Sequence, residues 1–280
     1  MHGQSDTWHV GDDIDVGGVS RIWKVTREND KIVYAAKLAR NTSSVKSVVY
    51  HNESIDIEVN ILRDLDHPGI IKIISEFSVL NDKSNRLVPL HLSDADNVMR
   101  VMIMPYYSDG SLAMRHIIGN RRPFAEIECK EIGRQMLSVL QYLKSLEIVH
   151  CDVKPGNILQ TDSNTYKLCD FGFASKVSQL EDVDCGTPYY VAPETLMGMP
   201  CSYASDLWSL AVSLFLLLVG VQPFDGYDVS RVNTLIKALN YAFPKNTEVS
   251  DMARAFIVAI ICPVENRMTV ETALCHPWLL

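Results

Sequence analysis

Four polar side chains that could act on a phosphate group lie close together in one stretch of the sequence. Lys154 follows Asp152 by two residues, Asn157 follows it by five, and Asp170 comes thirteen residues after Asn157. An aspartate can accept a hydroxyl proton, a lysine can neutralise phosphate charge, and an asparagine with a second aspartate can hold a divalent metal ion. These are the side chains that phosphoryl transfer requires. The alternative interpretation is that they are ordinary turn residues between strands.

Further motifs follow in a fixed order. Residues 148–159 read Ile-Val-His-Cys-Asp-Val-Lys-Pro-Gly-Asn-Ile-Leu, Asp-Phe-Gly occupies 170–172, and 186–194 read Gly-Thr-Pro-Tyr-Tyr-Val-Ala-Pro-Glu. Together they resemble the catalytic loop, the metal-binding turn and the peptide-binding platform of eukaryotic-type protein kinases. The platform segment and the His-Pro-Trp at 276–278 look most like the calcium/calmodulin-dependent kinase group, and the resemblance extends over essentially the whole chain.

The resemblance implies a role for each residue of the first group. Asp152 would orient and deprotonate an acceptor hydroxyl, Lys154 would neutralise the γ-phosphate of ATP, and Asn157 with Asp170 would hold Mg²⁺. Lys154 together with Thr187 favours serine or threonine acceptors over tyrosine. The expected substrate platform consists of Thr187, Pro188 and Glu194.

A lysine and a glutamate earlier in the chain complete the expected catalytic set. Lys37 lies fifteen residues after Ile22, the family's spacing for the lysine that grips the α- and β-phosphates. Glu58 begins a Glu-x-x-Ile-Leu pattern that resembles the main helix of the small lobe, so we expect an ion pair between Lys37 and Glu58. Glu53 is the alternative partner, but no such apolar pair follows it.

The match to the family's nucleotide loop is poor. Its Gly-x-Gly-x-x-Gly pattern falls on Asp15, Gly17 and Ser20, so the middle glycine alone is retained, with Gly18 beside it. A plain hairpin is the alternative interpretation of this segment. The nucleotide-binding residues that the resemblance implies are Ile14, Asp15, Val16, Gly17, Gly18, Ile22, Ala35, Lys37, Met104, Pro105, Tyr106 and Leu159.

The hydrophobic pattern predicts the elements that must position these residues. We expect a hairpin over 7–26, further strands at 31–38, 70–77 and 98–104, and an exposed loop between 80 and 97. Helices are expected over 52–65, with an apolar stripe of Ile57, Ile61, Leu62 and Leu65, over 124–146, and around Asp206.

These elements and the resemblance imply an α+β, bilobal protein-kinase fold over residues 1–280. Residues 1–104 would form a small antiparallel β-sheet lobe with one main helix, and 105–280 a larger, mainly helical lobe. The resemblance also implies that Asp206 accepts hydrogen bonds from the catalytic-loop backbone and that Arg267 pairs with Glu194.

Composition excludes several other classes of function. The net charge is −8 and no block of lysine and arginine interrupts it, so neither nucleic acid nor an anionic membrane is the expected partner. The apolar run 207–219 is too short to span a bilayer and contains two serines. No signal peptide is recognisable, and the seven scattered cysteines are typical of reduced thiols. We therefore expect a cytoplasmic or nuclear monomer that acts on protein substrates.

The expected function is the ATP-dependent phosphorylation of protein serine or threonine. Cys151 replaces an arginine that in many kinases binds a phosphate on the activation loop, and Val183 stands where that phosphate is usually attached. A thiol cannot form such a pair, so we expect activity without phosphorylation at that position. The alternative is a pseudokinase scaffold, which the poor glycine loop favours and the intact catalytic set opposes. A small-molecule kinase is disfavoured by the platform segment.

Overall fold

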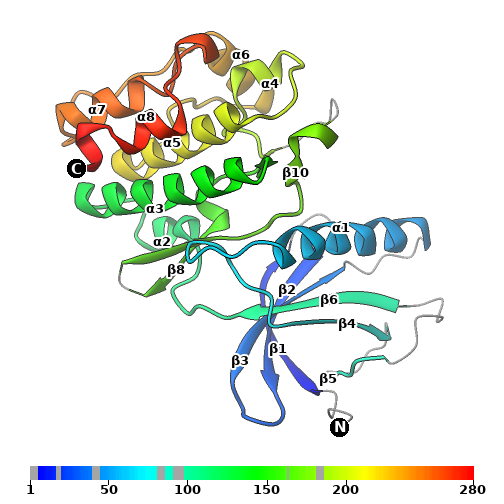
Figure 1. Ribbon diagram of the computed structural model, residues 1–280. Helices are drawn as coiled ribbons and strands as arrows, with labels where there is room; N and C mark the ends of the chain where they lie inside the picture. Colours follow the sequence, from blue (N-terminus) through cyan, green and yellow to red (C-terminus); the bar gives the residue numbers. More distant parts are fainter. Residues whose placement is uncertain are drawn as a thin grey trace. The chain divides into compact units, whose positions relative to one another are not determined.

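The computed structural model describes residues 6–16, 20–39, 45–80, 86–90, 98–162, 164–180 and 186–280, with the side chains of 16 and 45–50 excluded. The chain divides into two compact units (Figure 1). The first comprises residues 1–65 and 71–106, and the second comprises 66–70 and 107–280. The segment 66–70 belongs to the second unit because Ile70 forms a parallel bridge with Leu168, whose N–H donates to the Gly69 carbonyl at 2.8 Å.

One antiparallel sheet forms most of the first unit. Its strand order is β4-β6-β3-β2-β1-β5, and β1 contains two irregularities where it pairs with β2. Trp8 and Val25 lie fully inside its core, and the Trp8 ring meets the edge of Tyr34 and stacks at 6.5 Å on Phe77. The strands are β1 (Trp8–Val16), β2 (Ser20–Arg27), β3 (Val33–Ala39), β4 (Ser75–Leu80), β5 (Arg86–Leu87) and β6 (Val98–Pro105).

The one helix among the described residues of this unit, α1 (Val45–Arg63), packs against β3 and β6. It begins earlier than expected and ends shortly before the His-Pro-Gly segment. Its buried face carries Ile55, Val59 and Leu62, whereas Ile57 is 51% exposed. The predicted stripe was therefore wrong at Ile57. Ile55, Val59 and Leu62 are spaced four and three residues apart and share one helix face, whereas Ile57 lies outside that spacing and points away from it.

Two further boundaries differ from the sequence prediction. The strand expected over 70–77 begins only at Ser75, since residues 71–74 are irregular. The segment expected to be an exposed loop contains β5, which pairs with Trp8 and His9 of β1 and buries Leu87. The remainder of that segment, 81–85 and 91–97, lies outside the described residues.

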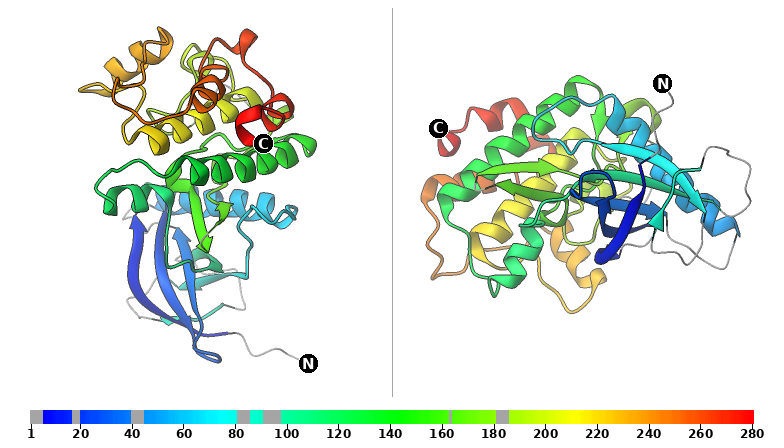
Figure 2. Two further views of the ribbon diagram at one scale, coloured as in Figure 1. Left: turned by 90° about the vertical axis from the view of Figure 1, so that its left-hand side faces the viewer. Right: turned by 90° about the horizontal axis from the view of Figure 1, so that it is seen from below.

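Helices dominate the second unit, where α3 and α5 lie side by side (Figure 2). Nearly all of α5 is buried, because its sequence is apolar around the whole helix circumference. A capping box at Ser202 starts it and Gly220 ends it. The helices are α2 (Leu112–Ile118), α3 (Glu126–Ser145), α4 (Pro193–Leu196), α5 (Tyr203–Val219), α6 (Val229–Lys237), α7 (Asp251–Val258) and α8 (Val270–Leu274).

Short strands of this unit hold the loops that carry the chemistry. β7 (Ile148–Val149) pairs with β10 (Ser175–Lys176), and β8 (Ile158–Asp162) pairs with β9 (Thr165–Leu168). Within the described ranges, no helix combines the length and the apolarity that crossing a membrane requires.

The cysteines do not all match the prediction of reduced thiols. Cys129, Cys151, Cys169, Cys262 and Cys275 are free, but Cys201 is disulfide-bonded. Cys185 lies outside the described residues. Which cysteines pair cannot be deduced from spacing alone, so this bond left no signal in the sequence.

Candidate active site

Asp152 lies in the loop between β7 and β8 and is 3% exposed. The hydroxyl of Thr187 donates to its Oδ1 at 2.7 Å, while Lys154 Nζ and Asn157 Nδ2 donate to its Oδ2 at 2.6 and 2.9 Å. The structure thus brings four of the sequence-predicted residues into one cluster. A buried carboxylate with three donors is held in one orientation, as a residue that must receive a proton from a substrate hydroxyl should be.

Lys154 and Thr187 are also linked to each other. Lys154 Nζ donates a hydrogen bond to the Thr187 hydroxyl oxygen at 2.5 Å, and this hydroxyl in turn donates a hydrogen bond to Asp152. The ammonium group therefore stays beside the carboxylate instead of extending into solvent. A positive charge held in this way is able to stabilise the negative charge of a transferring phosphoryl group. Thr187 connects the catalytic loop to the platform segment that it begins.

Helix α5 anchors the backbone of the catalytic loop through one buried carboxylate. Asp206 accepts the N–H of His150 at 2.7 Å and the N–H of Cys151 at 2.9 Å. Cys151 has a φ of +65°, in the left-handed region that non-glycine residues rarely adopt. Burial raises the pKa of Asp206 to about 7; the two N–H donors oppose this shift, and the nearby charge of Asp152 adds to it.

His150 joins the catalytic loop to the metal-binding turn. Its Nδ1 accepts the N–H of Asp152 at 3.2 Å, which leaves Nε2 to donate to the Cys169 carbonyl at 3.2 Å. The Phe171 ring packs edge-on at 4.7 Å from the imidazole. Burial lowers the pKa of His150, although the charges of Asp152 and Asp170 act to raise it. Asp170 itself has a φ of +62°.

The donor set at this site suits Mg²⁺. Asn157 uses its Nδ2 for the Asp152 carbonyl and carboxylate, so its amide oxygen remains available to a metal ion. Asp170, the other ligand expected from the sequence, has a carboxylate. Among the described residues, no group of three or more His, Cys, Asp and Glu side chains could hold a metal ion. Mg²⁺ does not require one, because it keeps several waters and binds one or two protein oxygens together with substrate phosphates.

The first unit contains the predicted lysine–glutamate pair. Lys37 Nζ lies 2.5 Å from Glu58 Oε2, with both residues buried. Glu53, the alternative partner, is exposed on α1. The pair forms because Glu58 lies on the same helix face as Ile55 and Leu62, which packs toward the sheet.

Strand register arranges the nucleotide residues expected in the first unit. Ile22 lies opposite Lys37, and Ala35 lies opposite Met104. Directly opposed residues share a sheet face, and so do residues two apart on one strand, so these four lie on the same face. Pro105 ends β6.

The other expected nucleotide residues are less closely grouped. Tyr106 follows β6, and the Lys24 ammonium lies over its ring at 4.9 Å. Ile14 and Asp15 are exposed in β1, which also includes Val16. Leu159 belongs to the second unit, where it bridges to Ser111. Gly17 and Gly18 lie outside the described residues.

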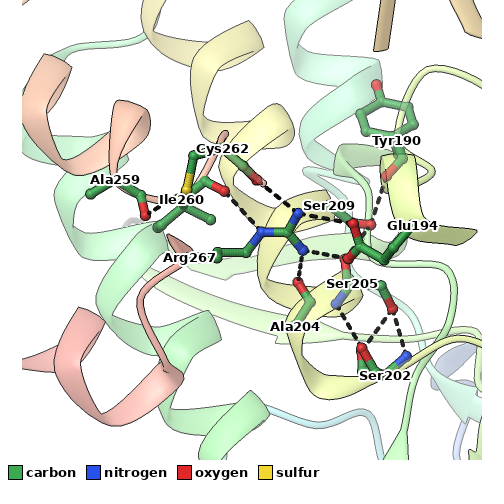
Figure 3. A network of polar contacts seen from close by, with 10 residues as sticks. All are labelled: Tyr190, Glu194, Ser202, Ala204, Ser205, Ser209, Ala259, Ile260, Cys262 and Arg267. Carbon is green, nitrogen blue, oxygen red and sulfur yellow. Dashed lines mark hydrogen bonds and ion pairs between the residues drawn. The ribbon is translucent and has the colours of Figure 1, made fainter. Parts of the chain in front are cut away.

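An ion pair beneath the platform fixes the segment after Thr187 and Pro188 (Figure 3). Arg267 binds Glu194 through two parallel contacts of 2.5 and 3.0 Å, and both residues are buried. The three remaining N–H donors of Arg267 go to the carbonyls of Ala204, Ile260 and Cys262. Every guanidinium donor is therefore used.

One contact of the platform was missed by sequence reasoning. Ser209 Oγ donates to the Tyr190 carbonyl at 2.7 Å, which ties the platform to α5 (Figure 3). The signal was present, since Ser209 interrupts an otherwise apolar helix, but the interruption was used only to argue against a membrane span. A hydroxyl in a buried helix marks a hydrogen-bonding partner nearby.

Comparison of the sequence with known proteins identifies one family. The protein kinase domain family matches residues 8–279. A probable myosin light chain kinase of Dictyostelium discoideum is 33% identical over 96% of this chain and 82% of its own length. The calcium/calmodulin-dependent protein kinase type 1 of Macrobrachium nipponense is 29% identical over the whole of this chain and 76% of its own length.

Another relative is considerably longer. The probable serine/threonine-protein kinase CCRP1 of Zea mays is 32% identical over 94% of this chain, but the match spans only 40% of that protein. The α+β fold class predicted from the sequence is confirmed by the family match and by the arrangement of the elements. The chain belongs to the protein kinase family, and its relatives are serine/threonine kinases that include the calcium/calmodulin-dependent type.

Proposed function

We propose that this chain transfers the γ-phosphate of ATP to serine or threonine hydroxyls of proteins. The observation that carries the proposal is the hydrogen-bonded cluster of Asp152, Lys154, Asn157 and Thr187. Its serine/threonine relatives support the type of acceptor. The buried pair of Lys37 and Glu58 supports the use of a nucleotide, because a lysine held in this way binds phosphate oxygens in kinases.

The residues of the chain divide the work of the transfer. Asp152 orients the acceptor hydroxyl and receives its proton, and Lys154 stabilises the negative charge that moves with the phosphoryl group. Lys37 positions the α- and β-phosphates. Mg²⁺, held by Asn157 and Asp170, would neutralise phosphate charge when bound. Thr187 and the platform as far as Glu194 present the peptide that carries the acceptor.

We also propose that activity does not require a phosphate at the usual activation-loop position, Val183, which lies outside the described residues. The support comes from Cys151, which is buried and donates its thiol weakly to the Val149 carbonyl at 3.8 Å. A neutral, buried thiol offers no charge to a phosphate. The loop is instead held by Asp206, whose two hydrogen bonds need no modification to form.

The test is phosphate transfer from Mg-ATP to a mixed peptide library, with the parent chain compared with Asp152→Asn. We expect transfer to Ser and Thr by the parent, and a loss of about three orders of magnitude or more in kcat for the variant, because the amide cannot receive the proton. Asp225→Asn is the matched control, since Asp225 is an exposed aspartate of the same unit. It should retain the parent's rate.

The pseudokinase alternative predicts a different outcome. A scaffold would transfer no phosphate in either form, with or without peptide, and its partners would bind equally well to the parent and to Asp152→Asn. Equal rates for the parent and Asp152→Asn would also overturn the proposal, because the measured activity would then not come from this cluster. Mass spectrometry of the active parent decides the second proposal: phosphate on the 173–185 segment that activity requires would contradict it.

A further inference from the structure

A tight turn at the start of the platform carries Thr187. The N–H of Tyr190 donates to the Thr187 carbonyl at 3.1 Å, so residues 187–190 close a β-turn around Pro188 and Tyr189. Tyr189 has a φ of +79°, in the left-handed region. Proline at the second position and a positive φ at the third are the features of a type II turn, where the third residue is usually glycine. The turn therefore places a bulky residue where its backbone is strained.

This turn also sets the position of two catalytic contacts. Thr187, its first residue, donates its hydroxyl to Asp152 at 2.7 Å and accepts Lys154 Nζ at 2.5 Å. A strained backbone conformation persists only where the surrounding structure holds it. The contacts of Thr187 therefore depend on the groups that restrain the turn from outside.

Tyr190 is the residue through which the rest of the second unit restrains the turn. Its carbonyl accepts Ser209 Oγ of α5 at 2.7 Å (Figure 3), and its hydroxyl accepts Gln222 Nε2 at 3.0 Å. Tyr190 lines the same small cavity as Asp152 and Thr187. Burial raises the pKa of Tyr190; the bond from Gln222 opposes this shift, and the charge of Asp152 adds to it. Tyr190 is thus held at its backbone and at its hydroxyl.

Gln222 belongs to a segment that is itself held on both sides. Before it, the N–H of Gly220 closes the last turn of α5. After it, Phe224 is buried and stacks on Trp208 at 5.8 Å. The Gln222 amide is therefore presented to Tyr190 from a segment with little freedom to move.

The amide of Gln222 is only partly satisfied. Its Oε1 is buried and has no hydrogen-bond partner among the described residues. An unpaired buried amide oxygen lowers stability, so an apolar side chain of similar length would be more stable at this position. Such a side chain could not bind the Tyr190 hydroxyl.

On the basis of the kinase activity proposed above, we propose that Gln222 is a positioning residue for phosphate transfer. It acts through Tyr190. Its bond to the hydroxyl holds Tyr190, the Tyr190 N–H holds the strained turn, and the turn holds the Thr187 hydroxyl against Asp152. When the bond from Gln222 is lost, the turn relaxes and Thr187 no longer stays in contact with Asp152.

The first test needs no activity measurement. Hydrogen exchange at the Tyr190 amide reports on the turn, because this N–H is bonded to the Thr187 carbonyl. We expect Gln222→Met to speed this exchange about tenfold, while the amides in the middle of α3 exchange as in the parent. The Tm should stay equal or rise, because methionine removes the unpaired oxygen. Unchanged exchange at Tyr190 would overturn the proposal, and so would a Tm that falls together with the activity.

The second test compares the kinetics of two variants that break the same bond. Gln222→Met should lower kcat about fivefold, while the KM for ATP changes less than about twofold. Tyr190→Phe keeps the ring without the hydroxyl and should have the same effect. The double variant should be no slower than either, because only one bond is lost; losses that multiply would contradict the proposal. Tyr227→Phe is the matched control, since Tyr227 is 91% exposed, and it should keep the parent's rate.

Tyr189 provides a rescue that a purely structural role of Gln222 would not predict. Glycine adopts the left-handed conformation without a steric penalty, so adding Tyr189→Gly to Gln222→Met should restore most of the lost kcat. Tyr189→Ala is the matched control, because alanine also lacks the ring but keeps the backbone strain. It should restore little. Equal kcat for the two double variants would assign the effect to the ring of Tyr189 and overturn the proposal.

These outcomes are separable from those that test the kinase function. A parent-like kcat for Gln222→Met would overturn the positioning role and leave the kinase function standing. Absence of transfer by the parent would refute the kinase function and any role of Gln222 in it. Exchange at the Tyr190 amide would then still decide whether Gln222 holds the turn.

Discussion

Asp206 accepts the backbone N–H of Cys151 at 2.9 Å, although the two residues lie on separate elements of the second unit. The same carboxylate accepts the N–H of His150, so one side chain of α5 fixes two consecutive peptide groups of the catalytic loop. Cys151 adopts a left-handed conformation to present its N–H in this way. The cost of that conformation and of the buried carboxylate is met by the packing of α5, whose residues are almost all buried.

Asp206→Asn is expected to change how stability depends on pH. The pKa of Asp206 rises from 3.8 to about 7 on folding, so between these values the folded chain binds a proton that the unfolded chain does not. The free energy of unfolding from this group is therefore highest below about pH 4 and is lost as pH rises to about 7. Asp206→Asn has no titrating group at this position and should lack this dependence of stability on pH. Thermal unfolding measured between about pH 4 and pH 7 tests this.

The comparison must be made as a difference between the two chains, since other groups titrate in the same interval. As pH rises toward 7, we expect the Tm of Asp206→Asn to rise relative to the Tm of the parent. Above about pH 7 the difference between the two Tm values should stay constant. Phosphate transfer by the variant should be lower at every pH, because the amide presents an N–H to one of the two backbone donors. If the Tm of the variant and the Tm of the parent changed with pH in the same way, the raised pKa of Asp206 would be contradicted.

Much of the fold and of the site could be predicted because local motifs and global structure agree. The order of the motifs gave the family, and the period of the apolar residues gave the main helices and strands. The helix phase at Ile57 was misjudged because isoleucines on both faces of α1 produce overlapping stripes. Ser209 was visible as a polar interruption of an apolar helix, but its partner, the Tyr190 carbonyl, could not be read from the sequence because it lies on a distant segment. The disulfide at Cys201 left no local signal, since cysteine pairing depends on which distant segments meet.

The pair of Lys37 and Glu58 should contribute to stability and activity in separable ways. Lys37→Met removes the ion-pair contact of the buried Glu58 carboxylate, and Glu58→Leu removes that of the buried Lys37 ammonium. Each single variant should therefore lower the unfolding free energy by about 3–5 kcal/mol. The double variant buries no charge and should recover most of that loss. Urea unfolding of the parent, the two single variants and the double variant measures these differences in unfolding free energy. All three variants should lose phosphate transfer, because the lysine is required to position the nucleotide.

An exposed pair provides the control for this cycle. Glu131→Gln breaks the contact with Arg134 on the surface of α3 and should change the unfolding free energy by less than about 1 kcal/mol. Its phosphate transfer should remain at the parent's level. A double variant of Lys37 and Glu58 that is no more stable than the single variants would show that the loss of stability comes from packing and not from the broken ion pair.

Arg267→Lys should destabilise the chain almost as much as Arg267→Ala. Lysine offers three donors on a flexible stem, whereas Arg267 satisfies two Glu194 oxygens and three carbonyls at once. A loss of about 3–5 kcal/mol in unfolding free energy is expected from chemical denaturation. Arg254→Lys is the matched substitution, because Arg254 donates hydrogen bonds to only two carbonyls, those of Thr247 and Val249. It should lower the unfolding free energy by less than Arg267→Lys does. Equal losses for the two lysine variants would refute the role of the guanidinium geometry.

Thr187→Val should lower kcat with little change in stability. The valine has the same shape but lacks the hydroxyl that accepts a hydrogen bond from Lys154 and donates one to Asp152. We expect a fall of about tenfold or more in kcat, measured with saturating ATP and peptide. Thr187→Ser retains the hydroxyl and should stay within about threefold of the parent. A serine variant as slow as the valine variant would assign the effect to the lost methyl group and its packing.

Gly220→Ala and Gly198→Ala test whether the end of α5 requires glycine for conformation alone or also for space. Both residues have left-handed φ values, +86° and +91°. A Cβ on Gly220 would lie 2.7 Å from the Arg121 carbonyl oxygen, whereas a Cβ on Gly198 would meet nothing within 4 Å. The left-handed conformation costs an alanine about 1–2 kcal/mol at either position. Only Gly220→Ala must also displace a backbone carbonyl. The position of Gly220 is restrained as well, because its N–H donates to the Leu216 carbonyl at 2.7 Å and so ends α5. Thermal unfolding should therefore rank Gly220→Ala well below Gly198→Ala, and equal melting temperatures would show that the Arg121 segment yields at no cost.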